Sequence, residues 1–279
     1  MSEPRLLWVT RPSPFNARTR QAVVAAGHGA LTVPALHVRR LGSPQLSEPT
    51  AVVFTSPHAV LHHPARTSWL ALPAFVVGDD TAALARRRGY RDVRPVGTAP
   101  GELRDLVLGS VSRFGHVVHF AERHESGSPV EALRSSGLSA ERAVVCESVK
   151  ATSEQLRSVS AALPFVDGIL IDSAAAGQVV AECIAAAGWH GIVFCRCPDC
   201  AAAFATLPGL LVELPPSPTE DSLLASLARF RGWPPGADLR AGVAAAAPRL
   251  RLVVSNEPGP SARLDRGGDG PDDPPPAAA

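Results

Sequence analysis

Hydroxyl-bearing turns that follow apolar runs are the features of this sequence best suited to chemistry. They are Thr55-Ser56-Pro57, after the apolar run 51–54, and Asp172-Ser173, after the run 169–171. One polar side chain in each turn can cap a following helix, and Pro57 suits a first helical turn, where its missing N–H costs nothing. A helix start presents unpaired N–H groups and the positive end of the helix dipole, so it can bind a carboxylate or phosphate. Two such turns predict two sheets that face one anionic ligand, although ordinary strand-to-helix connections share the pattern.

A group of cysteines in the last third of the chain is a candidate metal site. Cys195, Cys197 and Cys200 lie close together, and Cys183 and His190 precede them. A structural zinc site needs four ligands in tetrahedral geometry, usually from two spaced pairs. We expect Cys183 on a helix and the other three at a strand end and a turn, so we favour small core-filling side chains over ligands.

Histidines on the helix predicted after Pro57 are a second candidate metal site. His58 and His62 are spaced i, i+4 on one face, and His63 lies beside them. No carboxylate from the same turn joins them, so we expect solvated histidines. His58 is close enough to the helix start to contact an acidic ligand.

Two acids and three arginines mark the ends of another predicted helix. Asp79 and Asp80 could form a metal or acid–base pair, but they follow Gly78, where acids cap a helix and complement its dipole. Arg86-Arg87-Arg88 fits the last turn of the same helix. The sequence contains no phosphate loop and no dinucleotide-binding glycine motif.

The composition is that of a globular protein long enough for two α/β domains. The chain has 279 residues, and 46% of them are hydrophobic, enough for a core in each domain. A formal net charge of +1 creates no overall field that would recruit nucleic acid or an anionic membrane. An anionic ligand must therefore be bound locally, and arginine, which supplies nearly all the basic side chains, suits carboxylates well.

The N-terminus and the cysteines predict a cytoplasmic protein. A strand is expected from Leu6, and no long apolar segment of the secretory kind precedes it. No run reaches the ~18 apolar residues of a membrane span. Four of the five cysteines lie between Cys183 and Cys200, unlike a secreted disulfide framework.

Strand and helix patterns alternate along most of the chain and predict parallel sheets covered on both faces. The expected strands are 6–10, 29–34, 36–41, 52–55, 74–77, 92–96, 116–120, 143–149, 168–171, 191–194 and 210–213. The expected helices are 15–26, one from Pro57, 79–88, 101–111, 128–136, 154–163, 174–187, 198–205 and 220–229. Sheets of this kind bind ligands at the carboxyl ends of their strands.

The path of the chain predicts two domains, of which the first is discontinuous in sequence. Segment 36–41 alternates and precedes Gly42-Ser43-Pro44, as expected of a strand that leaves one domain for another. The pattern that restarts after Lys150 has too few strands for a sheet, so the strands before Pro34 are expected to return to it. We expect domain 1 at 1–35 plus 151–231, domain 2 at 36–150, and a mostly disordered Pro/Gly/Ala-rich tail at 232–279. Within the tail, 249–255 could be an extra strand or a weakly ordered segment.

Four motifs give the chain a resemblance to a known family. They are Val9-Thr10-Arg11-Pro12, Val53 to Pro57, Val76 to Ala82 and Ser217-Pro218-Thr219. In this order and spacing they resemble the uroporphyrinogen-III synthase family, over residues 6–230. The resemblance implies two doubly wound domains joined by a two-stranded connector, here 36–41 and 146–150, with the active site in the cleft between them. It implies neither a metal nor an organic cofactor.

The family resemblance implies hydroxymethylbilane as the substrate, a linear tetrapyrrole that carries an acetate and a propionate on each ring. Water leaves the terminal hydroxymethyl carbon, the substituted carbon of ring D attacks, and fragmentation and recombination invert ring D to give uroporphyrinogen III. Because the bilane also closes spontaneously without inversion, the protein would act chiefly by orienting the reactive ends. The implied enzyme is a cofactor-free hydro-lyase of tetrapyrrole biosynthesis, and we expect a monomer without a nucleic-acid or membrane partner.

The resemblance also implies substrate-binding residues, which would hold carboxylates through hydroxyl and backbone N–H groups. They are Arg11, Thr55, Ser56, Thr81, Ser173 and Thr219. It identifies no catalytic residue in this chain.

Two positions depart from the family pattern. Cys146 stands where the family has a connector tyrosine, and the single tyrosine, Tyr90, is expected to serve in packing. Segment 193–200 replaces a Gly…Thr-Ala turn, and Asp199 there could cap a helix but would repel a carboxylate. These departures keep a second function open, a non-catalytic homologue that binds a tetrapyrrole or another small anion. An unrelated two-domain sensor of small acids is a third.

Overall fold

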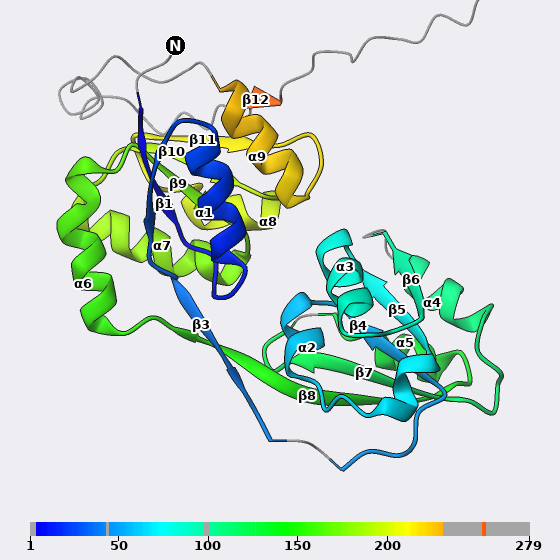
Figure 1. Cartoon of the computed structure of the whole chain (residues 1–279). Helices are drawn as coiled ribbons and strands as arrows, with labels where there is room; N and C mark the ends of the chain where they lie inside the picture. Colours follow the sequence, from blue (N-terminus) through cyan, green and yellow to red (C-terminus); the bar gives the residue numbers. More distant parts are fainter. Residues whose placement is uncertain (1–3, 43–44, 98–100, 126, 231–252, 255–279) are drawn as a thin grey trace, which may run out of the picture.

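The computed structural model describes residues 4–42, 45–97, 101–125, 127–230 and 253–254, which form two six-stranded sheets covered by helices (Figure 1). The first sheet contains β1 (Leu6–Val9), β2 (Gly29–Thr32), β9 (Gly168–Ile171), β10 (Gly191–Cys195), β11 (Leu210–Leu214) and β12 (Val253–Val254). The second contains β3 (Leu36–Arg40), β4 (Ala51–Phe54), β5 (Pro73–Val77), β6 (Asp92–Val96), β7 (His116–Glu122) and β8 (Ser139–Lys150). The expectation of an α/β fold with parallel sheets is confirmed.

The first sheet combines strands from distant parts of the chain. Its order is β12-β11-β10-β9-β1-β2, and all its neighbouring strands run parallel. Leu7 of β1 is aligned with Ala30 of β2 on one side and with Gly168 of β9 on the other. The N-terminal strands therefore complete the sheet to which the last third of the chain contributes.

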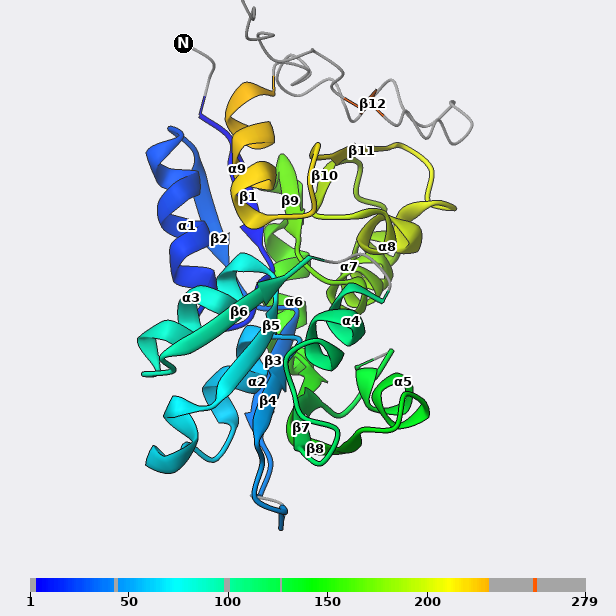
Figure 2. The ribbon, with the colours of Figure 1, turned by 90° about the vertical axis from the view of Figure 1, so that its right-hand side faces the viewer.

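Helices cover both faces of the first sheet, as Figure 2 shows from the side. One face carries α6 (Ser153–Ala162), α7 (Ala174–Ala187) and α8 (Pro198–Ala201), and the other carries α1 (Asn16–Ala25) and α9 (Glu220–Arg229). Successive side chains of a strand point to opposite faces, so Trp8 packs in the first layer and Leu7 in the second. This two-sided burial explains the continuous apolar runs of the strands.

The second sheet, with the order β3-β8-β7-β4-β5-β6, is also covered by helices on both faces, and all its pairs except β3–β8 are parallel. Its helices are α2 (Pro57–His62) and α3 (Asp79–Arg87) on one face, and α4 (Glu102–Leu108) and α5 (Pro129–Ser135) on the other. Val52 and Phe54 of β4 point to the first pair of helices, whereas Val53 points to the second. Tyr90 is buried in this core, with its ring against Phe54, as expected of a packing residue.

Strands β3 and β8 connect the two sheets (Figure 1). They pair antiparallel, from Leu36 opposite Lys150 to Arg40 opposite Cys146. The first half of β8 instead runs parallel to β7, with Ser139 opposite His116. The strand is therefore longer than the expected 143–149, because its apolar centre is flanked by polar residues that are also paired.

The strand order reverses at one place in each sheet. In the first sheet the reversal lies between β1 and β9, and in the second it lies between β4 and β7. Open parallel sheets bind ligands at the carboxyl ends of the strands at such reversals. Arg11 and Asp172 follow β1 and β9, while Ser56 and Glu122 lie at the ends of β4 and β7.

Two expected segments near the end of the chain are shorter in the structure. The helix expected at 198–205 is only one short turn, α8, followed by the 3-10 turn η3 (Ala202–Phe204). Val253 and Val254 pair with the end of β11 as the short strand β12. The remainder of the expected tail, 232–252 and 255–279, lies outside the described residues.

No described helix is both long and apolar enough to cross a membrane.

Two buried histidines make the stability of the fold sensitive to acid. His63 hydrogen-bonds Tyr90 Oη at 2.9 Å, and His119 hydrogen-bonds Thr55 Oγ1 at 2.9 Å. Burial lowers the pKa of His63 to about 4 and that of His119 to about 3. Below about pH 6.5 the unfolded chain binds protons at both residues, whereas the folded chain does not until these lower values. Their contribution is therefore complete above about pH 6.5 and decreases as the pH falls toward 4.

We expect the urea midpoint to be clearly lower at about pH 5 than at about pH 7.5, with a smaller decrease in the double variant His63→Gln/His119→Gln. Replacement of the exposed His124 by Gln should leave the wild-type pH dependence unchanged. Equal pH dependence in the wild type and the double variant would contradict this assignment.

Candidate active site

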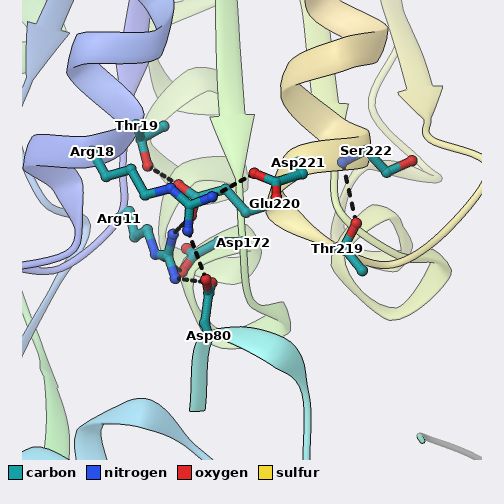
Figure 3. A network of polar contacts seen from close by, with 9 residues as sticks. All are labelled: Arg11, Arg18, Thr19, Asp80, Asp172, Thr219, Glu220, Asp221 and Ser222. Atoms are coloured by element: carbon teal, nitrogen blue, oxygen red, sulfur yellow. Dashed lines mark hydrogen bonds and ion pairs between the residues drawn. The ribbon is translucent and has the colours of Figure 1, made fainter. Parts of the chain in front are cut away.

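An ion cluster around Arg11 joins the two sheets (Figure 3). The Arg11 side chain is only 7% exposed, and its guanidinium lies 3.0 Å from Asp80 and 3.6 Å from Asp172. It also pairs with Glu220, at the start of α9. Asp80 belongs to α3 on the second sheet, whereas the other two acids lie on the first. Burial opposes the charge, but the hydrogen bond to Glu220 and the charge of Asp172 outweigh it and raise the pKa of Arg11.

Helix α1 adds a second guanidinium to this cluster. Arg18 lies 2.8 Å from Asp80 and 2.5 Å from Asp221, and Thr19 donates to Glu220 at 2.5 Å. The carboxylate of Asp80 is thus held between two guanidinium groups of the first sheet (Figure 3). These two arginines can bind a carboxylate that approaches from the second sheet.

The structure corrects the expectation for Asp80. Gly78 is the N-cap of α3 and no side chain caps this helix, although Asp79 and Asp80 both lie in its first turn. Asp79 is exposed, so its effect is limited to the helix dipole. Asp80 instead forms ion pairs across the two sheets, which local sequence does not reveal. Arg11, expected as a cation for the substrate, already has three carboxylate partners.

A second polar group lies where β4 and β7 end. Glu122 accepts hydrogen bonds from Ser56 Oγ and Ser148 Oγ, each at 3.0 Å. Ser56 also accepts from the N–H of Ala59 at 3.1 Å and so caps α2. The start of this helix therefore already contacts a carboxylate of the protein.

Beside Glu122, a buried histidine and a second carboxyl group share one hydroxyl. Thr55 hydrogen-bonds both His119 and Glu125, and the last two are 4.0 Å apart. Burial raises the pKa of Glu125, although the hydrogen bond from Thr55 opposes this shift. Burial lowers the pKa of His119, so this histidine is neutral at neutral pH. The raised pKa of Glu125 means that its carboxyl group retains its proton to a higher pH than an ordinary glutamate.

His58 lies between the Arg11 cluster and the polar group around Glu122 and is close enough to feel charges from both. Its ring, on α2, packs edge-on against Phe15, just before α1, with 4.9 Å between the ring centroids. Burial lowers the pKa of His58, and the charges of Glu122 and Asp172 act on it from the second and first sheets. The expectation of solvated histidines is therefore wrong for His58, and also for His63, because both rings pack against aromatic side chains.

A pocket opens at the carboxyl end of the first sheet, next to the Arg11 cluster. Its apolar wall consists of Val9, Leu170, Ile171 and Leu223, and its polar wall of Arg11, Thr19, Asp172, Arg196 and Glu220. Arg196 directly follows β10 and is half-buried. Among the described residues no carboxylate forms an ion pair with it. Arg196 is thus a cation of this pocket that remains available to a ligand.

The structure shows which of the expected hydroxyls cap helices. Ser56, Ser173 and Thr219 are the N-caps of α2, α7 and α9, and each accepts from the N–H three residues further on. Thr55 and Asp172, the alternatives in the first two turns, do not cap. Thr81 is 2% exposed within the first turn of α3, so its hydroxyl is buried and does not cap a helix.

The structure shows the surroundings of Cys146 and Asp199, the two departures from the family pattern. Cys146 is fully buried in the core of the second sheet, and burial raises its pKa to about 12. Asp199 lies in the first turn of α8 but does not cap it, since Cys197 occupies the N-cap position. Within the described parts of the chain, no three His, Cys, Asp or Glu side chains are arranged to hold a metal ion.

Several polar residues of these groups were missed from the sequence, and four of them carry the arguments below. They are Arg18, Glu122, Glu125 and Arg196. Two of them had a usable signal, because Arg196 follows β10 directly and Glu122 ends β7, both at the carboxyl edge where such sheets bind ligands. The other two depend on contacts between distant segments.

These observations define an α/β protein whose two parallel sheets present arginines, acids and helix starts at neighbouring strand ends, an arrangement suited to a small anionic ligand. The family model of uroporphyrinogen-III synthase HemD matches residues 17–225. The chain therefore belongs to the uroporphyrinogen-III synthase family.

A solved structure agrees with this family at the level of the fold. A uroporphyrinogen-III synthetase from Helicobacter pylori 26695 is 14% identical, with a TM-score of 0.51, over 82% of this chain and 100% of that one. A mutant uroporphyrinogen III synthase from Thermus thermophilus is 12% identical, with a TM-score of 0.46, over 78% of this chain and 88% of that one. A comparison with curated protein sequences found no significant match.

The buried position of Arg11 predicts a large loss of stability when it is replaced. Arg11→Met would leave Glu220, whose side chain is 6% exposed, without its closest cation, and we expect a loss of about 3–5 kcal/mol. Arg18→Met is the matched control, because Arg18 is 53% exposed and its loss should cost less than about 1 kcal/mol. Urea denaturation measures both values, and similar losses would show that burial of Arg11 does not determine the cost.

Proposed function

We propose that this protein is a uroporphyrinogen-III synthase, a hydro-lyase that converts hydroxymethylbilane to uroporphyrinogen III with inversion of ring D. The observation that carries the proposal is the family match over residues 17–225. The facing strand ends support it, because a flexible polyanion with two reactive ends needs contacts on two sides to be held in one conformation.

We further propose that the two sheets with their helices are two domains. Domain 1 would comprise 1–35 plus 151–231, and domain 2 would comprise 36–150. The β3–β8 ladder is part of the second sheet, and just before β3 the N–H of Ala35 donates to the carbonyl oxygen of Thr10 beside β1, which supports the ladder's role as the connector. In this proposal the enzyme is a cytoplasmic monomer that acts on a small substrate without a cofactor.

The arginines of domain 1 would be the main binding groups for the carboxylates of the substrate. Asp80 is held by Arg11 and Arg18 in the same way as a ligand carboxylate would be, so a substrate carboxylate can take its place. Arg196 supplies a further guanidinium in the adjacent pocket. Binding would therefore exchange an internal ion pair for one with the substrate and would loosen the contact between α3 and domain 1.

Among the helix starts, that of α7 is the most favourable for an anion in domain 1. Ser173 caps it, and its first turn contains no acidic residue. Thr219 caps α9, but Glu220 and Asp221 follow at once and oppose an anion. In domain 2, Ser56 with Thr55 and the backbone at Thr81 would contact carboxylates, although Glu122 competes at Ser56.

Glu125 is our candidate for the group that assists departure of the hydroxide. The connector tyrosine of the family is replaced by Cys146, which is buried and does not face a ligand. Glu125 lies beyond the end of β7, is partly exposed, and burial raises its pKa. A carboxyl group whose pKa is raised retains its proton to a higher pH, and in that state it can donate the proton to a leaving hydroxide.

The buried Cys146 also favours a second candidate function, a non-catalytic homologue that binds a tetrapyrrole or another small anion. The two functions are separated by product analysis. Bilane generated in situ is incubated with the purified protein, and the oxidised porphyrins are separated by chromatography. We expect mainly isomer III, because the spontaneous closure gives isomer I. Isomer I alone, from protein with a folded circular dichroism spectrum, would reject catalysis and leave the binding function.

Exchange of Asp80 for a substrate carboxylate predicts an unusual direction for one variant. Asp80→Asn removes the internal competitor, so the apparent KM for bilane should fall several-fold, equivalent to about 1 kcal/mol. Asp79→Asn is the matched control, because Asp79 is exposed and lies in the same helical turn. An unchanged or raised KM in Asp80→Asn would show that the substrate does not displace this carboxylate.

A further inference from the structure

Two cysteines of the unexplained group lie in contact at the end of β10. Cys197 and Cys200 form the sequence Cys197-Pro198-Asp199-Cys200, and their sulfur atoms are 3.3 Å apart. Cys197 is the N-cap of α8 and Cys200 lies one turn further on, buried at 1% exposure. A C-x-x-C motif that begins a helix after a parallel strand is typical of thiol–disulfide chemistry.

The surroundings of Cys197 stabilise its thiolate. The thiol of Cys200 donates to its sulfur, and the charge of Arg196 is nearby, so the pKa of Cys197 is lowered although burial opposes this. The pKa of Cys200 is raised, because its thiol donates this hydrogen bond and is buried. Cys197 is half-buried and can be reached, whereas Cys200 is shielded. The sulfur of Cys197 is therefore suited to attack a disulfide, and that of Cys200 to resolve the mixed disulfide.

The backbone holds this pair in a fixed place. Gly177, in the first turn of α7, lets α8 approach closely, because a Cβ there would lie 2.8 Å from the carbonyl oxygen of Cys200. Cys195, two residues before the motif, is fully buried, and burial raises its pKa. It does not compete with Cys197 as a nucleophile.

We propose that Cys197 and Cys200 are a reversible dithiol–disulfide pair that exchanges with small-molecule disulfides. The Cys197 thiolate attacks one sulfur of the disulfide and releases one thiol. Cys200 then gives up its proton and attacks Cys197 in the mixed disulfide, releasing the second thiol and closing the Cys197–Cys200 bond. The two cysteines are oxidised by two electrons, and the small disulfide is reduced to two thiols. The sulfurs need to approach only from 3.3 Å to the ~2.05 Å of a disulfide.

A structural zinc site is the rival explanation of the same cysteines. It would need four ligands around one centre. Within the described residues, no third His, Cys, Asp or Glu joins Cys197 and Cys200 in a group that could hold a metal. The redox pair requires only the two sulfurs that are in contact.

Oxidation of the full-length protein tests the proposal directly. Reduced protein is incubated with oxidised glutathione, quenched in acid, alkylated, digested and analysed by mass spectrometry. We expect a Cys197–Cys200 disulfide in the wild type, a glutathione mixed disulfide at Cys197 in Cys200→Ser, and neither product in Cys197→Ser. Cys183→Ser is the control and should behave like the wild type, since Cys183 lies on α7 outside the motif.

A second measurement needs no variant and so does not depend on their folding. Iodoacetamide should modify Cys197 of the reduced wild type with a half-maximal rate below about pH 8.5, the ordinary cysteine pKa. Absence of the Cys197–Cys200 disulfide in oxidised wild type would overturn the proposal, as would one tightly bound zinc that requires both cysteines. Because these assays do not use bilane, their outcome is independent of the proposed enzyme activity.

Discussion

The buried guanidinium of Arg11 is the constraint on which the arrangement of this protein depends. A charge that is 7% exposed must be paired, and its partners come from the end of β9, the start of α9 and the first turn of α3. The first two elements belong to the first sheet and its helices, and α3 belongs to the second. The chain of β3 and β8 and the hydrogen bond from the N–H of Ala35 to the carbonyl oxygen of Thr10 link the sheets, but the Arg11 cluster fixes where α3 meets the first sheet.

The same cluster shapes the chemistry at the strand ends. It contains more carboxylates than guanidinium groups, so under the proposed function an anionic ligand that binds there would displace a carboxylate of the protein rather than enter a simple cationic pocket. Asp80 is the carboxylate that comes from the second sheet. In the proposed binding mode, ligand binding and the contact between the sheets are coupled, because both use the guanidinium groups of Arg11 and Arg18.

Parallel topology explains why so many polar groups meet at one edge. All strands of the first sheet run the same way, so the residues that follow β1, β9 and β10 gather at one end: Arg11, Asp172 and the Arg196-Cys197 turn. The candidate anion site and the cysteine pair are neighbours for this reason. They share Arg196, which lines the pocket and whose charge helps to lower the pKa of Cys197.

The sequence by itself determined the alternation of strands and helices, and it narrowed the N-caps of α2 and α7 to two neighbouring residues each. These features depend on burial periodicity and on side chains within one turn, which local sequence contains. Only the tertiary structure decided that Asp80 pairs with Arg11, that His58 packs against Phe15, and that β8 extends beyond its apolar centre. These outcomes depend on contacts between residues far apart in the chain, and such contacts leave no periodic trace in the sequence.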